Sequence, residues 1–183
     1  MQHTGRSSSR TSSSSKAKAA KTSRSARSAP GDAVALLKAD HRQVEEWFEQ
    51  FEKSRSDDKK ADLARRICGA LRIHTAIEEE IFYPAFLEAT GDEDIHHEAE
   101  VEHAGAKNLI SQIEKSGPRD DYFDARVKVL SEMIKHHVKE EEQRDGMFAK
   151  AKASNMDLEA LGERMQQRKK ELEKSSNGKA AAQ

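Results

Sequence analysis

The sequence predicts an all-α protein, built as an antiparallel up-down four-helix bundle with a short C-terminal fifth helix and a disordered N-terminal tail. Between Pro30 and about Ser154 only two further prolines occur, and apolar residues recur at helical spacing instead of alternating. Four amphipathic segments of similar length are separated by short polar stretches. Amphipathic helices joined by short loops bury their apolar stripes by packing as an antiparallel bundle.

The first two helices are expected at Asp32 to about Arg55 and at about Asp57 to Ala89, where Gly91 ends the second. The stripe of the first helix consists of Val34, Leu37, His41, Val44, Phe48 and Phe51. The stripe of the second consists of Ile67, Leu71, His74, Glu78, Ile81 and Ala85. Pro84 removes a backbone hydrogen bond inside the second helix, so we expect a kink near Ile81.

The third helix is expected to start at Asp92 and to end at Gly117 and Pro118, and the fourth to run from about Asp120 to Lys150. A shorter, strongly charged fifth helix is expected at about Asp157 to Lys174. The third stripe consists of Ala99, His103, Ala106, Ile110 and Ile113, and the fourth of Val127, Leu130, Ile134, His137 and Glu141. The predicted organisation is a tail at 1–30, the bundle at 31–152, and a C-terminal helix with a disordered end at 153–183.

The N-terminal tail differs from the rest of the chain in charge. Residues 1–28 contain seven Lys or Arg and no Asp or Glu, whereas the whole chain has a net charge of −1. The tail is also rich in serine and has no apolar periodicity, so it cannot bury enough surface to become ordered. Three interpretations compete: a solubilising disordered tail, which we favour, a weak nucleic-acid-binding arm, and an organelle transit peptide.

The composition limits the class of protein. The chain has 183 residues, 35% hydrophobic and 36% charged, which supports one domain with a modest core. No apolar run approaches the roughly 20 residues that span a bilayer, and the N-terminus lacks the apolar centre of a secretory signal. We therefore expect a soluble, cytoplasmic protein. Cys68 is the only cysteine, so neither an intrachain disulfide nor a thiolate metal cluster can form.

A repeated pattern of metal-ligating residues is the strongest functional signal. His41 is followed by His74 and Glu78, and the same order returns as His103, then His137 and Glu141. Each second histidine precedes its glutamate by four residues, which places imidazole and carboxylate one turn apart on the same face of a helix. The chain therefore carries two copies of one half-site.

Six such ligands indicate a dinuclear centre. A glutamate in an apolar stripe costs several kcal/mol unless it is paired or binds a cation. One zinc ion needs about four ligands, which six groups exceed, whereas carboxylates can bridge two ions. Two Fe ions therefore fit best, with Mn or Zn as substitutes. A ferritin-like site needs Glu-x-x-His on two helices, but Glu93/His96 and Glu100/His103 both lie on the third helix, which disfavours that architecture.

The same order of residues resembles the bacterial hemerythrin-like domain, also called the HHE cation-binding domain. The resemblance is carried by the strings ALLKADHRQVEEWFEQFE, HTAIEEEIFYPAF, EVEHAGAKNLI and KHHVKEEE and covers residues 33 to about 150. It implies a four-helix bundle around an oxo- or hydroxo-bridged di-iron centre. The implied terminal ligands are His41, His74, His103 and His137, and the implied bridging ligands are Glu78 and Glu141.

The sequence departs from the family's oxygen carriers at one ligand. Those proteins have a fifth histidine one turn from the ligand of the third helix, where this chain has Ala99 and Lys107. The position is then filled by water, which leaves an exchangeable site, or by Glu100, Glu79 or His96. Glu100 ranks first because it lies three residues from His103.

Two further expectations concern the surroundings of the site. His136/Glu140 has the same spacing as His137/Glu141, but the apolar stripe selects the second pair. His136 and Glu140 are then outward or support a ligand imidazole from behind. The large apolar residues of the region are expected to form the core or a sheath around the metals: Trp47, Phe82, Tyr83 and Phe86.

These features predict a non-haem di-iron protein that binds O2, NO or peroxide for sensing, storage or detoxification. The alternative is an enzyme that turns over peroxide or NO, or an iron donor for iron-sulfur cluster repair. A third hypothesis is a structural or regulatory module that the metal only stabilises. No glycine-rich phosphate loop or Ser-His-Asp arrangement indicates another catalytic chemistry.

Overall fold

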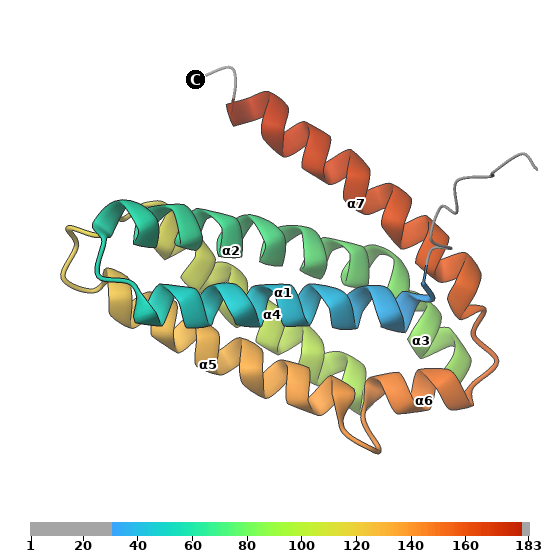
Figure 1. Cartoon of the computed structure of the whole chain (residues 1–183). Coiled ribbons are helices and arrows are strands. Elements are labelled where there is room, and N and C mark those ends of the chain that lie inside the picture. The colour runs from blue at the N-terminus through green and yellow to red at the C-terminus, as the bar shows by residue number, and fades with distance from the viewer. Residues whose placement is uncertain (1–30, 181–183) are drawn as a thin grey trace, which may run out of the picture.

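The structure, a computed structural model, describes residues 31–180, and this part of the chain is made of helices and short connections without a strand. The bundle consists of α1 (Ala33–Lys53), α2 (Asp57–Ile77), α4 (Glu93–Glu114) and α5 (Phe123–Glu142). Figure 1 shows that consecutive helices of the bundle run in opposite directions. The predicted all-α bundle is confirmed, whereas the tail at 1–30 lies outside the described residues. No helix of the described part is long and apolar enough to cross a membrane.

Polar side chains fix where the first three bundle helices begin. Asp32, Ser56 and Asp92 each accept a hydrogen bond from the backbone N–H three residues later, at 2.8, 3.4 and 3.3 Å. Each bond satisfies one of the backbone donors that a helix leaves unpaired at its start. These helices therefore begin within one residue of the predicted positions.

One π-helical turn, η1 (Glu78–Phe82), interrupts the second predicted helix before it continues as α3 (Tyr83–Thr90). Pro84 has no N–H to donate to the carbonyl one turn back, so a regular α-helix cannot pass this point unchanged. The irregularity lies where Pro84 predicts it, around Ile81. Single π turns inside helices are frequent at functional sites, and this one begins at Glu78.

The predicted C-terminal end of the fourth helix is wrong. α5 ends at Glu142 rather than near Lys150, and a separate short helix, α6 (Met147–Ala153), follows a tight turn. The turn allows α6 to bury Phe148 and two neighbouring residues over the end of the bundle. Burying this apolar area stabilises the reversal relative to a straight helix that would leave it in water.

The last helix, α7 (Leu158–Ala180), is longer than the predicted helix from about Asp157 to Lys174. It packs against α1, α2 and η1. Figure 1 shows its C-terminal part extending away from the bundle. Its contacts with the bundle include the buried Leu161 and Met165 and the ion pairs Arg168–Glu80 and Lys169–Asp40.

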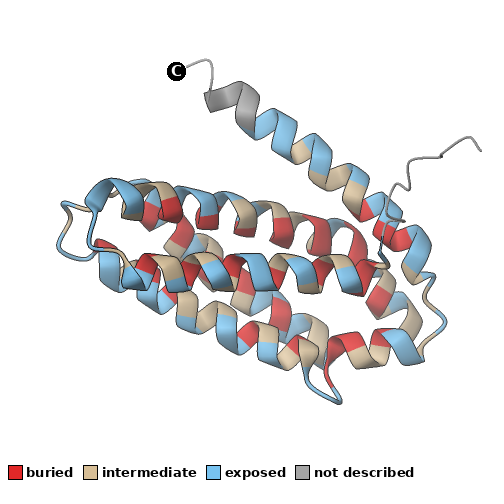
Figure 2. Cartoon of the chain, in the orientation of Figure 1, coloured by how far each residue is buried: buried red, intermediate tan, exposed pale blue. Residues whose placement is uncertain are grey.

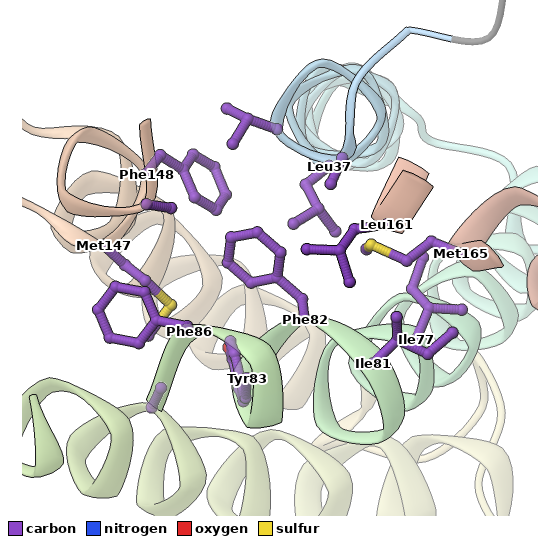
Figure 3. Close-up of a cluster of buried hydrophobic side chains, with 14 residues drawn as sticks. Leu37, Ile77, Ile81, Phe82, Tyr83, Phe86, Met147, Phe148, Leu161 and Met165 are labelled. Carbon is purple, nitrogen blue, oxygen red and sulfur yellow. The ribbon is translucent and has the colours of Figure 1, made fainter. Parts of the chain in front are cut away.

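Two apolar clusters fill the bundle, and Figure 2 shows that buried residues line its inner faces. The cluster at the α3, α6 and α7 end, drawn in Figure 3, includes Leu37, Ile77, Phe82, Phe86, Phe148 and Met165. The cluster toward the α1–α2 connection includes Val44, Phe48, Ile67, Leu71, Ile110 and Leu130. The predicted metal-ligating residues fall between these two clusters along every bundle helix.

Gly162 provides a test of how α7 is attached. A Cβ atom there would lie 2.7 Å from the carbonyl oxygen of Gly31 and 2.9 Å from the backbone nitrogen of Ala33. Because backbone atoms cannot move aside as a flexible side chain can, Gly162→Ala should lower the free energy of unfolding by about 1–3 kcal/mol. Gly69→Ala is the matched control, since nothing lies within 4 Å of its Cβ position, and it should raise stability by about 0.5–1 kcal/mol. Chemical denaturation measures both, and a gain in stability for both variants would contradict close packing of α7.

Candidate metal centre

Four histidines from four helices meet in the middle of the bundle. His41 lies on α1, His74 on α2, His103 on α4 and His137 on α5, and none is more than 5% exposed. The Nε2 atoms of His41 and His74, the first pair, are 3.1 Å apart. Those of His103 and His137, the second pair, are 3.3 Å apart. The two pairs correspond to the two half-sites of the sequence.

Two glutamates connect the histidine pairs. Oε2 of Glu78 lies 3.3 Å from Nε2 of His74 in the first pair and 3.4 Å from Nε2 of His103 in the second. Oε2 of Glu141 lies 3.4 and 3.6 Å from the Nε2 atoms of the two remaining histidines. Each carboxylate thus contacts one imidazole of each pair. We call these six side chains, four histidines and two glutamates, the ring.

The ring contains buried oxygen atoms without a hydrogen-bond partner among the described side chains. These atoms are both carboxylate oxygens of Glu78 and Oε2 of Glu141. Glu78 is completely buried, and Glu141 is 3% exposed. A buried carboxylate that lacks a partner costs several kcal/mol. A cation between the histidine pairs supplies the missing partner, so the donor set fits a metal.

Burial shifts the pKa values of four ring residues. Burial, together with the charge of Glu141, raises the pKa of Glu78 well above its usual value, and burial also raises that of Glu141. Burial and the neighbouring imidazoles lower the pKa of His41 and His103 to about 2. Both imidazoles are therefore neutral near pH 7, and neutral imidazole is the form that binds metals.

The positions of the donor atoms are suited to two ions. His41, His74 and Glu78 have ligand atoms within 4.8 Å of one another, and so do Glu78, His103 and His137. Glu78 belongs to both groups and lies between them. Imidazole nitrogens and carboxylate oxygens are ligands that Fe, Mn and Zn accept.

Four carboxylates, which we call the outer carboxylates, lie behind the imidazoles, each next to an outward Nδ1 atom; three of them form hydrogen bonds to it. The contacts are Glu142 to His41 at 2.9 Å, Asp40 to His74 at 3.6 Å, Glu79 to His103 at 2.9 Å, and Glu102 to His137 at 2.7 Å. A carboxylate that accepts from Nδ1–H fixes the tautomer and the ring orientation. The Nε2 lone pair then faces the centre of the bundle.

The outer carboxylates occupy matched sequence positions in the two half-sites, as the ring residues do. Asp40 and Glu102 each precede a ring histidine in the sequence, and Glu79 and Glu142 each follow a ring glutamate. Each of them supports an imidazole that belongs to a different helix. The sequence pattern alone does not assign Asp40, Glu102 or Glu142 a role, but their matched positions in the two half-sites are the signal that identifies them.

The candidates for an additional ligand do not join the ring. Glu79 supports His103 from outside and also pairs with Lys107, at 2.5 Å. Glu100 has a side chain 56% exposed, and its contact is with His96, at 3.9 Å. His136 and Glu140 also lie outside the ring, and the side chain of His136 is 62% exposed. Glu100 lies three residues before His103 and is therefore about 60° away from it around α4. This offset turns the side chain of Glu100 toward solvent.

Tyr83 has a role that the sequence pattern does not reveal. Phe82 and Phe86 form the expected apolar sheath, and Tyr83 is buried beside them (Figure 3). Its hydroxyl, however, lies 3.2 Å from Nε2 of His103 and donates to Oε1 of Glu141 at 3.3 Å. Burial and the charge of the nearby ring carboxylates raise the pKa of Tyr83 well above its usual value. The ring therefore has a protonated phenol at the edge of its second histidine pair.

The comparisons with known proteins identify the family and the fold. The sequence model of the Hemerythrin HHE cation binding domain matches residues 32–150, so the chain belongs to this family. The crystal structure of a hemerythrin HHE cation binding domain-containing protein from Mycobacterium kansasii has the same fold, with a TM-score of 0.68 and 24% identity over 81% of this chain and 91% of that one. A protein of Nostoc sp. named DNA nickase is 29% identical over 107 residues. That match covers 58% of this chain and 30% of the relative.

The raised pKa of Glu78 predicts how the metal-free protein responds to pH. Above about pH 4.5 the unfolded chain releases this proton and the folded chain keeps it, so stability falls as pH rises. His41 and His103 have the opposite effect, but only below about pH 6.5, where the unfolded imidazoles bind protons. Above about pH 4.5, the unfolding free energy of Glu78→Gln should therefore fall less steeply with pH than that of the wild type, by up to about 1.4 kcal/mol per pH unit.

Denaturation of the chelator-treated protein at several pH values measures this effect. Glu132→Gln, at an exposed position of α5, is the control and should follow the wild type. The unfolding free energy of Glu78→Gln could instead fall with pH as steeply as that of the wild type, or the variant could be less stable than the wild type at pH 8. Either result would show that Glu78 is not an unpartnered buried acid.

Proposed function

We propose that the ring holds two iron ions and that the protein binds O2 or a related small molecule, NO or peroxide, at this centre. The observation that carries the proposal is the ring itself, in which each glutamate contacts one imidazole of each pair. In the proposed assignment, His41 and His74 bind one ion and His103 and His137 bind the other. Glu78 and Glu141 bridge both. This assignment gives every unpartnered ring oxygen a cation.

Iron is preferred over manganese and zinc because of the chemistry proposed for the site. Iron supplies electrons for the reaction of O2, NO or peroxide when it is bound, whereas zinc has no redox chemistry. The protein supplies geometry and exclusion of water. Three of the outer carboxylates hydrogen-bond Nδ1 of His41, His103 and His137 and keep the Nε2 atoms of these imidazoles aimed at the centre. Phe148 stacks on the imidazole of His41 with 5.8 Å between ring centroids. Phe82 in turn packs on Phe148, at 5.8 Å.

The second histidine pair has the space that a small molecule needs. Ala99 stands one turn before His103 and contributes only a methyl group. A cavity of about 70 Å³ lies beside Ala99 and reaches His137 and Glu141. One water molecule takes up about 30 Å³ in the liquid, so a diatomic molecule or peroxide fits this volume. The hydroxyl of Tyr83 lies 3.2 Å from Nε2 of His103 in the same pair.

Contact with nucleic acid is not part of this proposal. The basic tail to which it was assigned, residues 1–28, lies outside the described part of the chain. The name DNA nickase belongs to a relative, and the match with this chain covers only 30% of that relative's length.

The test is iron content and reversible binding of O2. Protein purified without O2 should contain two irons per chain, and admission of O2 should produce a charge-transfer band that disappears when O2 is removed. His74→Ala or Glu141→Ala should lower the iron content to about half or less, since each removes a ligand. His97→Ala, exposed on α4, is the control and should keep both irons.

Unchanged iron in both ligand variants would refute the proposed site. Stoichiometric, reversible binding supports a carrier or sensor. Repeated turnover of peroxide or NO without loss of iron would instead favour the enzymatic alternative, and transfer of iron to an acceptor protein would favour a role in iron-sulfur cluster repair.

A further inference from the structure

A second group of metal-ligating side chains lies outside the ring, between α4 and α5. It consists of Glu102 on α4 and of His136 and Glu140 on α5, whose ligand atoms all lie within 4.8 Å of one another. Nε2 of His136 is 3.1 Å from Oε1 of Glu140 and 3.5 Å from Oε1 of Glu102. We call these three residues the outer cluster. None of them belongs to the ring.

The outer cluster differs from the other acidic positions of the surface in its partners. Many surface carboxylates pair with Lys or Arg, as Glu114 does with Arg72 and Glu80 with Arg168. Among residues 31–180, Glu102 and Glu140 form ion pairs only with histidines. Two carboxylates and one imidazole that converge without a basic partner make a ligand set for a divalent cation, which such ligands bind at about 2.0–2.2 Å.

The outer cluster is connected to the ring in two ways. Glu102 directs Oε1 toward His136, and its Oε2 accepts a hydrogen bond from Nδ1 of the ring histidine His137 at 2.7 Å. The cavity of about 70 Å³ is lined by Glu102 and Glu140 of the outer cluster and by His137 and Glu141 of the ring. Oε2 of Glu141 is buried and has no hydrogen-bond partner. The same cavity therefore borders two residues of the outer cluster and two residues of the ring.

We propose that Glu102, His136 and Glu140 bind a divalent metal ion at the surface and pass it through this cavity to the ring, so that the outer cluster is the loading site of the metal centre. The transfer step rests on the proposed function of the ring, whereas binding of an ion to the outer cluster does not.

The physical reason for a loading site is the burial of the ring. Its histidines are 2–5% exposed, so a hydrated ion has to lose water before it reaches them. The three partly exposed side chains of the outer cluster would replace part of the hydration shell of the ion. Water would still occupy its remaining coordination positions. The ring then offers more ligands than the outer cluster does, which draws the ion inward. Glu98, also at the cavity, adds a further negative charge along the path.

The test uses the double variant His136→Gln/Glu140→Gln, which leaves Glu102 in place to support His137. The matched control is Glu93→Gln/His97→Gln, which removes an exposed pair with the same residue types and four-residue spacing from α4. The metal-free proteins are mixed with Fe(II) without O2, and protein-bound iron is counted over time. The outer-cluster variant should load about tenfold more slowly than the control. Both should reach the same final iron content, because the ring is unchanged.

A second measurement isolates binding to the outer cluster. Iron-loaded protein is titrated with Mn(II), and free Mn(II) is followed by electron paramagnetic resonance. Wild type and control should bind one additional Mn(II) per chain, and the outer-cluster variant should not. Equal Mn(II) binding in all three proteins would overturn the site, and equal loading rates with Mn(II) binding lost would overturn its role in transfer. A wild type that never retains two irons would count against the ring instead, and the Mn(II) comparison would still decide the outer site.

Discussion

The structure depends on one constraint: two carboxylates and four imidazoles are buried together at the centre of a small helical bundle. Glu78 has no exposed surface, and neither of its oxygens has a hydrogen-bond partner among the described side chains. In water these groups are solvated, so their burial costs free energy that the apolar clusters on either side have to offset. A cation in the ring would remove much of this cost and would thereby couple stability to metal binding.

The surroundings of the ring serve to hold it in one geometry. The outer carboxylates fix three imidazoles by hydrogen bonds and contact the fourth, each acting from a neighbouring helix, so the four helices must keep their mutual positions for the ring to form. Asp40, which stands behind His74, also pairs with Lys169 of α7. The C-terminal helix is thereby connected to a ring histidine through one shared carboxylate, and its docking contributes to the metal centre as well as to the core.

Much of this arrangement could be predicted from the sequence, because side-chain direction along a helix is periodic. The six ring residues lie together, as their spacing in two half-sites predicts, and Pro84 marks the place of the π turn. Contacts that depend on how helices rotate against each other could not be predicted in this way. Glu102 supports an imidazole on another helix, Tyr83 directs its hydroxyl out of an apolar sheath, and α5 ends early because burial of Phe148 outweighs the local tendency to continue the helix.

Each glutamate of the ring is proposed to bridge two iron ions. Anomalous X-ray scattering at the iron absorption edge, from crystals of the iron-loaded protein, tests it most directly. Two anomalous peaks are expected inside the ring, one beside the His41 and His74 imidazoles and one beside those of His103 and His137, with Glu78 and Glu141 each reaching both. A single peak, or peaks only outside the ring, would contradict it.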